Sequence, residues 1–305
     1  MSGRASDGPG GRAAADVAVA AFHALRAELF DPAGSPVPFR LRDKLSTQDD
    51  PLDEHLAQRL GERLGDEAVV VPATGPLISP DMVVAAPAGV REIRRAGGEL
   101  TTAEAVGIEV KKLQRSPTGR IARPGGVDYN STPPSRTISV FHDRERITLP
   151  GFYLFVCLED AGHGRCRVTA MALCDGGVLN EDVALYEERT GIRRKTIGLG
   201  SFGDGLDRER PMLVFANPLG WRELDGVATL IHRRADLDHH ALRRVATVER
   251  THPARLERPA SRYALYRAAG DVMLETDPPV VRDPFPAVAR RAEQTQARGR
   301  FKLTI

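Results

Sequence analysis

The chain has 305 residues, of which 41% are hydrophobic and 28% are charged, and its formal net charge is only +2. These values are typical of a soluble globular protein, and they exclude a uniformly basic surface. No apolar run approaches the roughly 20 residues that cross a bilayer. The three cysteines have no CxxC spacing, which argues against a zinc site or a disulfide framework. We therefore expect a cytoplasmic protein that is not associated with a membrane.

The first third of the chain predicts two helices followed by short strands. Residues 1–15 are rich in Gly, Ala and Arg, and they are expected to form a disordered leader. An Ala-rich helix is predicted over 16–30, and a second helix over 51–64. Asp49 or Asp50 would cap the second helix, whose leucines recur every four residues. Strands are predicted at 67–72 and 81–84, with a polar connector or short helix at 89–99.

The run Ala-Val-Gly-Ile-Glu-Val-Lys-Lys-Leu at 105–113 predicts a strand. Successive side chains of a strand point to opposite faces. Ile108 and Val110 therefore share one face, and Glu109 and Lys111 share the other. This places a carboxylate and an ammonium group together on a rigid support.

The rest of the chain is mostly β in pattern. Residues 112–134 form a Gly- and Pro-rich loop, after which strands are predicted at 137–141, 151–158, 165–173 and 211–216. A helix is predicted at 183–190, Arg-rich helical stretches in the last third, and a strand at 300–305. We expect one α/β (α+β) domain over 16–305, with a mixed central sheet flanked by helices. The catalytic core of this domain would span residues of about 50–175. A C-terminal part that contacts DNA or forms the dimer would span about 176–305.

Asp81, Glu109 and Lys111 are the residues with the clearest chemistry. Two carboxylates supply the hard oxygen ligands that Mg²⁺ prefers, and the backbone carbonyl of Val110 is a candidate third ligand. A lysine beside them can assist an attacking water or stabilise charge on a phosphate. The alternative is an exposed strand that carries an ordinary cross-strand ion pair.

A local excess of positive charge follows this strand. Between Lys111 and Arg136 there are six basic residues and one acid. Side chains here suit contacts to phosphates and base edges. The candidate DNA-binding residues are Lys112, Arg115, Arg120, Arg123, Asn130, Ser131, Thr132 and Arg136. The alternative for 130–135 is a polar turn before a polyproline stretch.

A nucleotide cofactor is not expected. Residues 198–203 fit GxGxxG, but no clear helix follows to receive a pyrophosphate. The GxxxxGK[ST] pattern of phosphate-binding loops does not occur in the sequence.

Ser79-Pro80-Asp81 followed by Glu109-Val110-Lys111-Lys112 resembles the motif of the PD-(D/E)xK nuclease superfamily. The continuation from Asp128 through Pro134 is similar to that of some type II restriction endonucleases. The resemblance covers roughly residues 79–140. It implies that Asp81 and Glu109 bind Mg²⁺, that Lys111 is catalytic, and that a homodimer acts on palindromic double-stranded DNA. Additional or alternative ligands remain open among Glu99, Glu104, Glu54 and Glu62.

The function expected from the sequence is therefore a Mg²⁺-dependent, sequence-specific endodeoxyribonuclease. Two alternatives remain: a structure-specific nuclease of DNA repair or recombination, and a non-catalytic DNA-binding regulator.

Overall fold

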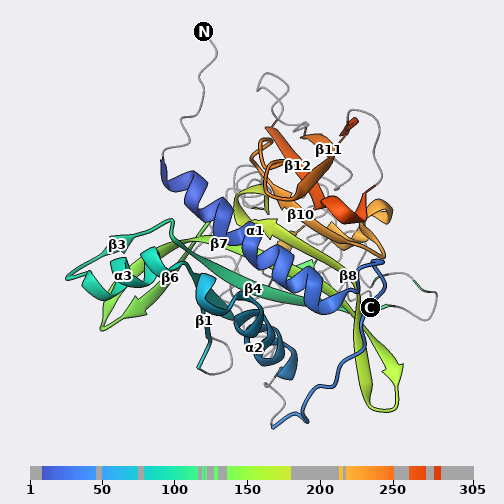
Figure 1. Ribbon diagram of the computed structural model, residues 1–305, viewed down its shortest axis with the longest axis horizontal. Helices are drawn as coiled ribbons and strands as arrows, with labels where there is room; N and C mark the ends of the chain where they lie inside the picture. Colours follow the sequence, from blue (N-terminus) through green and yellow to red (C-terminus); the bar gives the residue numbers. More distant parts are fainter. Residues whose placement is uncertain are drawn as a thin grey trace, which may run out of the picture.

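A mixed β-sheet with helices on it forms the body of the protein. The computed structural model describes residues 9–45, 50–74, 79–115, 119, 121, 127–129, 136–179, 213–215, 218–250, 261–272 and 278–282. Within these residues the main sheet has 11 strands, which confirms the predicted α+β class with a mixed sheet (Figure 1).

The helices are α1 (Pro9–Leu29), α2 (Pro51–Leu64) and α3 (Pro87–Arg95), with short 3-10 turns η1 (Gly65–Glu67), η4 (Pro218–Gly220), η5 (Arg222–Leu224) and η6 (Ala269–Asp271). The first strands are β1 (Val69–Pro72), β2 (Met82–Ala85), β3 (Leu100–Thr101), β4 (Ala105–Leu113), β5 (Val127–Tyr129), β6 (Thr137–His142) and β7 (Glu145–Gly162). The remaining strands are β8 (Arg165–Asp175), β9 (Leu213–Phe215), β10 (Ala228–His232), β11 (Leu242–Arg250), β12 (Ser261–Ala268) and β13 (Val280–Arg282).

The strand order of the main sheet is β1-β2-β4-β7-β8-β10-β12-β11-β13, and β3 and β6 also pair with β7. The pairs β4–β7, β8–β10 and β11–β13 are parallel, whereas the other neighbours along this order are antiparallel. Strands β5 and β9 form a separate antiparallel pair. The strand β4, which carries Glu109 and Lys111, thus lies between β2 and β7.

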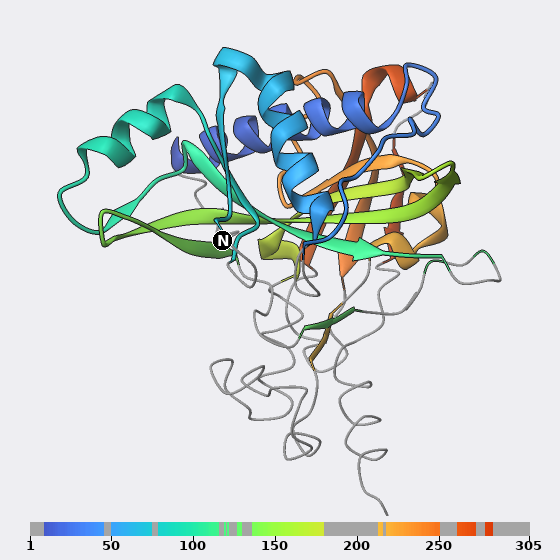
Figure 2. The ribbon, with the colours of Figure 1, turned by 90° about the horizontal axis from the view of Figure 1, so that it is seen from below.

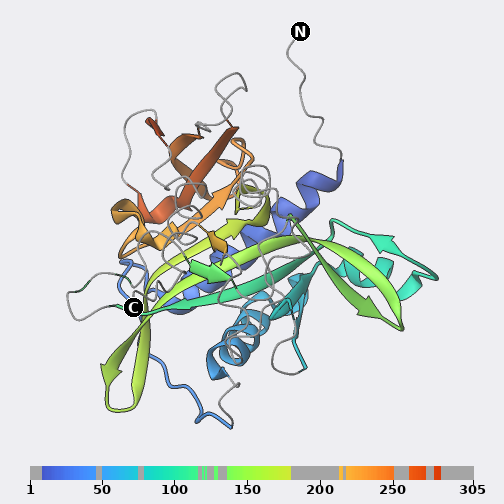
Figure 3. The same cartoon turned by 180° about the vertical axis from the view of Figure 1, so that it is seen from behind.

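Both faces of the central strands are buried. Helices α1 and α2 lie on one face, as Figure 2 shows, and their Phe22, Leu25 and Leu56 belong to the same apolar cluster as Ile108 and Phe152. The opposite face, seen in Figure 3, holds a second cluster. That cluster includes Tyr153, Phe155, Cys157, Cys174, Leu219 and Ile231. Burial on two faces explains why β7 and β8 read as long apolar runs rather than alternating ones.

Helix α2 confirms its prediction. Asp50 is the N-cap, and its side chain accepts a hydrogen bond from the Leu52 N–H at 3.2 Å. Pro51 occupies the first turn, where its missing N–H has no partner to lose. The leucine stripe of this helix is fully buried.

Helix α1 is longer than expected, since it begins at Pro9 within the segment predicted as a leader. Ala13, Ala14 and Ala15 are the strongest helix formers, so they extend the helix towards the N-terminus from Asp16.

The last third of the chain corrects another prediction. In place of Arg-rich helical stretches, the described residues form β10, β11 and β12. Their arginines obscured a two-residue alternation in which Ala246 and Val248 are buried on one strand, and Tyr263 and Leu265 on the next. The helix predicted at 183–190 and the strand at 300–305 lie outside the described residues.

Candidate functional site

The site lies where β2 begins beside the middle of β4. Met82 pairs with Ile108 in an antiparallel register, and β2 contributes no partner beyond that point. The second half of β4, from Val110 to Leu113, therefore continues past the start of β2 while it remains paired with β7. Asp81 immediately precedes β2 at the point where its pairing with β4 ends.

Asp81 binds to the strand edge through its side chain. Its Oδ2 accepts a hydrogen bond from the Val110 N–H at 2.6 Å. The carboxylate thus satisfies a backbone group that β2 leaves without a strand partner, and this contact fixes its orientation. The predicted neighbourhood of Asp81 and the Glu-x-Lys strand is confirmed.

Glu109 is buried, with 8% of its surface exposed, and both of its oxygens are engaged. Lys111 Nζ lies 2.7 Å from Oε1, and the Ser79 hydroxyl donates to Oε2 at 2.9 Å. Ile108 and Val110 belong to the core cluster under α1 and α2, so the predicted division of β4 into two faces is also confirmed. Glu109 and Lys111 form an ion pair on the other face.

The first turn of α2 supplies a further carboxylate. Lys112 Nζ forms an ion pair with the Oδ2 of Asp50, the N-cap residue, and so joins β4 to the start of the helix. Asp53, in the first turn, lies close enough to Asp81 for the charge of Asp81 to raise the pKa of Asp53.

Burial and neighbouring acids raise two pKa values in the site. Burial, and then repulsion from Asp81 and Asp50, raise the pKa of Asp53 to about 7. Burial, and then the charge of Glu109, raise the pKa of Asp81, although the Val110 N–H and Lys111 oppose that shift. Both shifts show that these surroundings disfavour the ionised forms of Asp53 and Asp81.

This donor set fits a divalent cation of the magnesium class. Asp53, Asp81 and Glu109 offer only hard oxygen donors, and a bound cation would offset both the burial of Asp53 and Asp81 and the repulsion that Asp81 has with Glu109 and Asp53. Among the described residues no three His, Cys, Asp or Glu side chains are already gathered as a complete metal-binding group. Binding would require that Lys111 and Ser79 release at least one oxygen of Glu109. The backbone carbonyl of Val110 stays a predicted ligand.

The four acids that the sequence left open lie in other surroundings. Glu54 is exposed and forms an ion pair with Arg42 at 2.6 Å. Glu62 forms an ion pair with Arg59 within α2. Glu99 is exposed ahead of β3. Glu104 precedes β4, and its backbone lies against Gly89 of α3. The helix acid at the site is Asp53, which the sequence did not single out.

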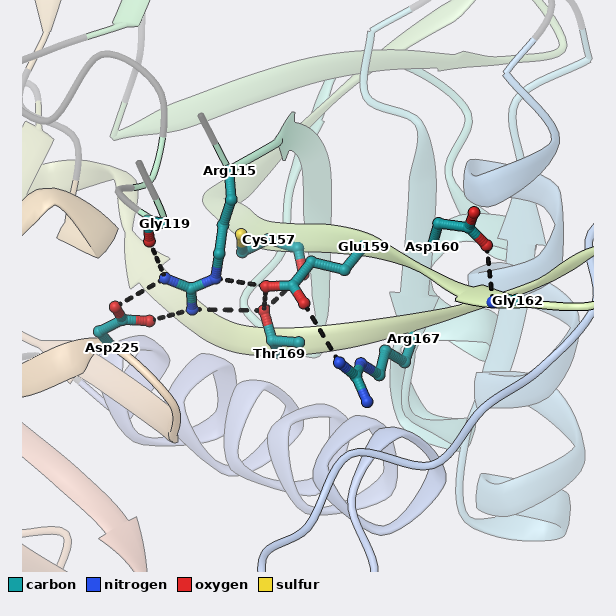
Figure 4. Close-up of polar contacts among 9 residues, drawn as sticks. All are labelled: Arg115, Gly119, Cys157, Glu159, Asp160, Gly162, Arg167, Thr169 and Asp225. Carbon is teal, nitrogen blue, oxygen red and sulfur yellow. Dashed lines mark hydrogen bonds and ion pairs between the residues drawn. The ribbon is translucent and has the colours of Figure 1, made fainter. Parts of the chain in front are cut away.

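Arg115 is held by carboxylates of the protein itself (Figure 4). Its guanidinium pairs with Glu159 of β7 and with both oxygens of Asp225, and Nη1 lies 2.9 Å from Asp225 Oδ2. The same Nη1 donates to the Gly119 carbonyl at 2.9 Å. Arg115 therefore joins the end of β4 to β7 and to the turn before β10. Its predicted contact with DNA stays a prediction.

Arg136 is exposed at the start of β6. Its carbonyl accepts a hydrogen bond from the Gly151 N–H at 3.0 Å, and Gly151 pairs with Gly107 of β4. Gly107 lies two residues before Glu109 on β4, so these contacts hold the backbone of Arg136 beside the site. The other predicted DNA contacts, Arg120, Arg123, Asn130, Ser131 and Thr132, lie outside the described residues.

The chain matches no protein-family model, no curated protein and no solved structure. None of the helices in the described part of the chain is long and apolar enough to cross a membrane.

Proposed function

We propose that this protein is a Mg²⁺-dependent endodeoxyribonuclease, most simply a type II restriction enzyme that hydrolyses phosphodiester bonds of double-stranded DNA. One observation carries the proposal: Asp81, Glu109 and Lys111 lie together where β2 begins beside β4 of a mixed sheet, in the chain order of the nuclease motif. In this proposal the protein is cytoplasmic and acts as a homodimer on palindromic DNA.

Each residue would contribute a distinct step. Asp81 and Glu109 would hold a divalent ion, with Asp53 as a further ligand directly or through water. That ion, when bound, orients water and stabilises charge on the scissile phosphate. Lys111, which lies 2.7 Å from Glu109, would transfer its ammonium contact to the phosphate or the attacking water when Glu109 turns to the ion. The Val110 N–H keeps Asp81 in place throughout.

The test is incubation of the purified protein with supercoiled plasmid, with and without Mg²⁺, followed by gel electrophoresis. A discrete set of linear fragments that requires Mg²⁺ supports a restriction enzyme. Nicking confined to branched or damaged DNA would support a repair nuclease. DNA binding with a steep salt dependence and no cleavage in any divalent ion would support a regulator and contradict the proposal.

A further inference from the structure

A two-stranded ribbon projects from the body next to the site. It consists of β6 and the first residues of β7, over 136–150, and we refer to it as the β6–β7 ribbon. It extends beside α3 and β3 at the left of Figure 1 and at the right of Figure 3. The turn at its tip is tight, since Asp143 and Arg144 both have positive φ, at 48° and 72°.

The two faces of the ribbon differ sharply in character. On one face Ile138, Ile147 and Leu149 are buried, and Ile147 and Leu149 belong to the cluster that contains Val90 and Ile93 of α3. The register places Ser139 opposite Thr148, and Phe141 opposite Arg146, on the other face. Phe141 is 72% exposed there. Few large apolar side chains in the described residues are as exposed, so this face is rigidly supported from behind and open in front.

The ribbon carries exposed cations along its whole length. Arg136 lies at its base, Arg146 on its open face and Arg144 at its tip, and all three are exposed. Arg146 Nε donates to the Ser139 hydroxyl at 3.0 Å, which keeps its guanidinium on the open face. The two acids, Asp143 and Glu145, are both at the turn, where Asp143 lies 3.6 Å from His142.

The base of the ribbon is fixed to the site. Pro80 and Ile138 both pack against Gly107 of β4, which lies two positions before Glu109. A Cβ atom at Gly107 would lie only 3.2 Å from Pro80 and 3.3 Å from Ile138. The turn at the tip lies about seven residues before Gly151 in the sequence, so at the rise of a strand the tip is roughly 23 Å from Gly151. This reach corresponds to about seven base-pair steps of a duplex.

We propose that the open face of the β6–β7 ribbon enters the major groove of the DNA that is cleaved at the site. This inference rests on the proposed function. The major groove admits a two-stranded ribbon, arginine reads guanine there, and an aromatic ring contacts thymine methyl groups. In contrast to these ribbon residues, Lys112 and Arg115 form ion pairs with the protein's own carboxylates. Phe141 and Arg146 are the base-reading pair, and Arg136 and Arg144 contact phosphates.

The test uses two ribbon variants and one control. The first variant combines Arg144→Ala and Arg146→Ala, the second carries Phe141→Ala alone, and the control is Arg94→Ala. Arg94 is exposed on α3, which covers the buried face of the same ribbon. Binding to fluorescently labelled plasmid fragments is measured without Mg²⁺ over a range of salt concentrations. We expect the double variant to bind about tenfold more weakly and, because only Arg144 of the two contacts a phosphate, to lose roughly 1 from the slope of log affinity against log salt. Phe141→Ala should weaken binding mainly to cleavable fragments, and the control should bind normally.

The outcomes separate this inference from the proposed function. If the wild type cleaves DNA and both ribbon variants bind it unchanged, the ribbon inference is overturned and the nuclease stands. If the wild type binds without cleaving while the variants lose affinity, the ribbon inference stands and the nuclease falls. A change from dimer to monomer in sedimentation, with DNA affinity kept, would identify the ribbon as a contact between copies and overturn the inference. Failure of the wild type to bind DNA overturns both.

Discussion

The Asp81 carboxylate is oriented by a hydrogen bond from the Val110 N–H. The Val110 N–H would belong to the sheet ladder if β2 began two residues earlier, but it binds the Asp81 carboxylate instead. Glu109 is fixed in a similar way by Ser79 and Lys111. At the residue scale the site is therefore a set of carboxylates placed before any ligand arrives, which is the condition for efficient metal-assisted chemistry.

The raised pKa of Asp53 predicts how the stability of the metal-free protein depends on pH. Because the folded state favours protonated Asp53, its contribution to the free energy of unfolding is largest below pH 4 and falls as pH rises towards 7. Asp53→Asn removes this charge, so the variant should exceed the wild type in stability by on the order of 2 kcal/mol at pH 8 and match it near pH 4. Urea unfolding without divalent ions measures the difference.

Glu54→Gln is the matched control for that experiment, since Glu54 is its exposed neighbour on α2 and pairs with Arg42. Its pH profile should follow the wild type. Parallel profiles for Asp53→Asn and the wild type would show that Asp53 does not share the crowded charge of the site. If Asp53 is a metal ligand as proposed, the same Asn variant should bind Mg²⁺ more weakly, because its gain in stability comes from the loss of that carboxylate.

At the scale of elements, the ion pair between Lys112 and Asp50 connects β4 with the start of α2. It holds the first turn of the helix, and with it Asp53, against the edge of the sheet. We therefore expect Lys112, the neighbour of the proposed catalytic residue Lys111, to position the start of α2, while its phosphate contact stays a prediction.

A double-mutant cycle tests this role. Lys112→Met and Asp50→Asn each remove the ion pair, and Asn preserves the N-cap. We expect a coupling energy of about 1 kcal/mol, since both side chains are partly exposed, and a severalfold loss of Mg²⁺ affinity in each single variant. Calorimetric titration without DNA measures the affinity. Additive stability effects, together with weaker DNA binding in Lys112→Met alone, would restore Lys112 to the DNA interface.

At the scale of the whole molecule, the sequence predicts those features that depend on local pattern. The alternation around Glu109 and the capped leucine stripe of α2 are short-range signals, and both are confirmed. Asp53 and the pairing of Arg115 with Asp225 were not predicted, because they depend on how a helix docks on a strand and on contacts across 110 residues. The strands β10 to β12 were missed because arginines on their exposed positions resembled a polar helix face.

The most direct test of the central claim compares plasmid cleavage by the wild type, Glu109→Ala and Glu104→Ala in the presence of Mg²⁺. Glu104 lies roughly 16 Å from Glu109 along the same segment, so it is a matched acid outside the site. We predict Mg²⁺-dependent fragments from the wild type and Glu104→Ala. For Glu109→Ala we predict a loss of at least about a hundredfold in rate, with DNA binding retained. Full cleavage by Glu109→Ala would contradict the account.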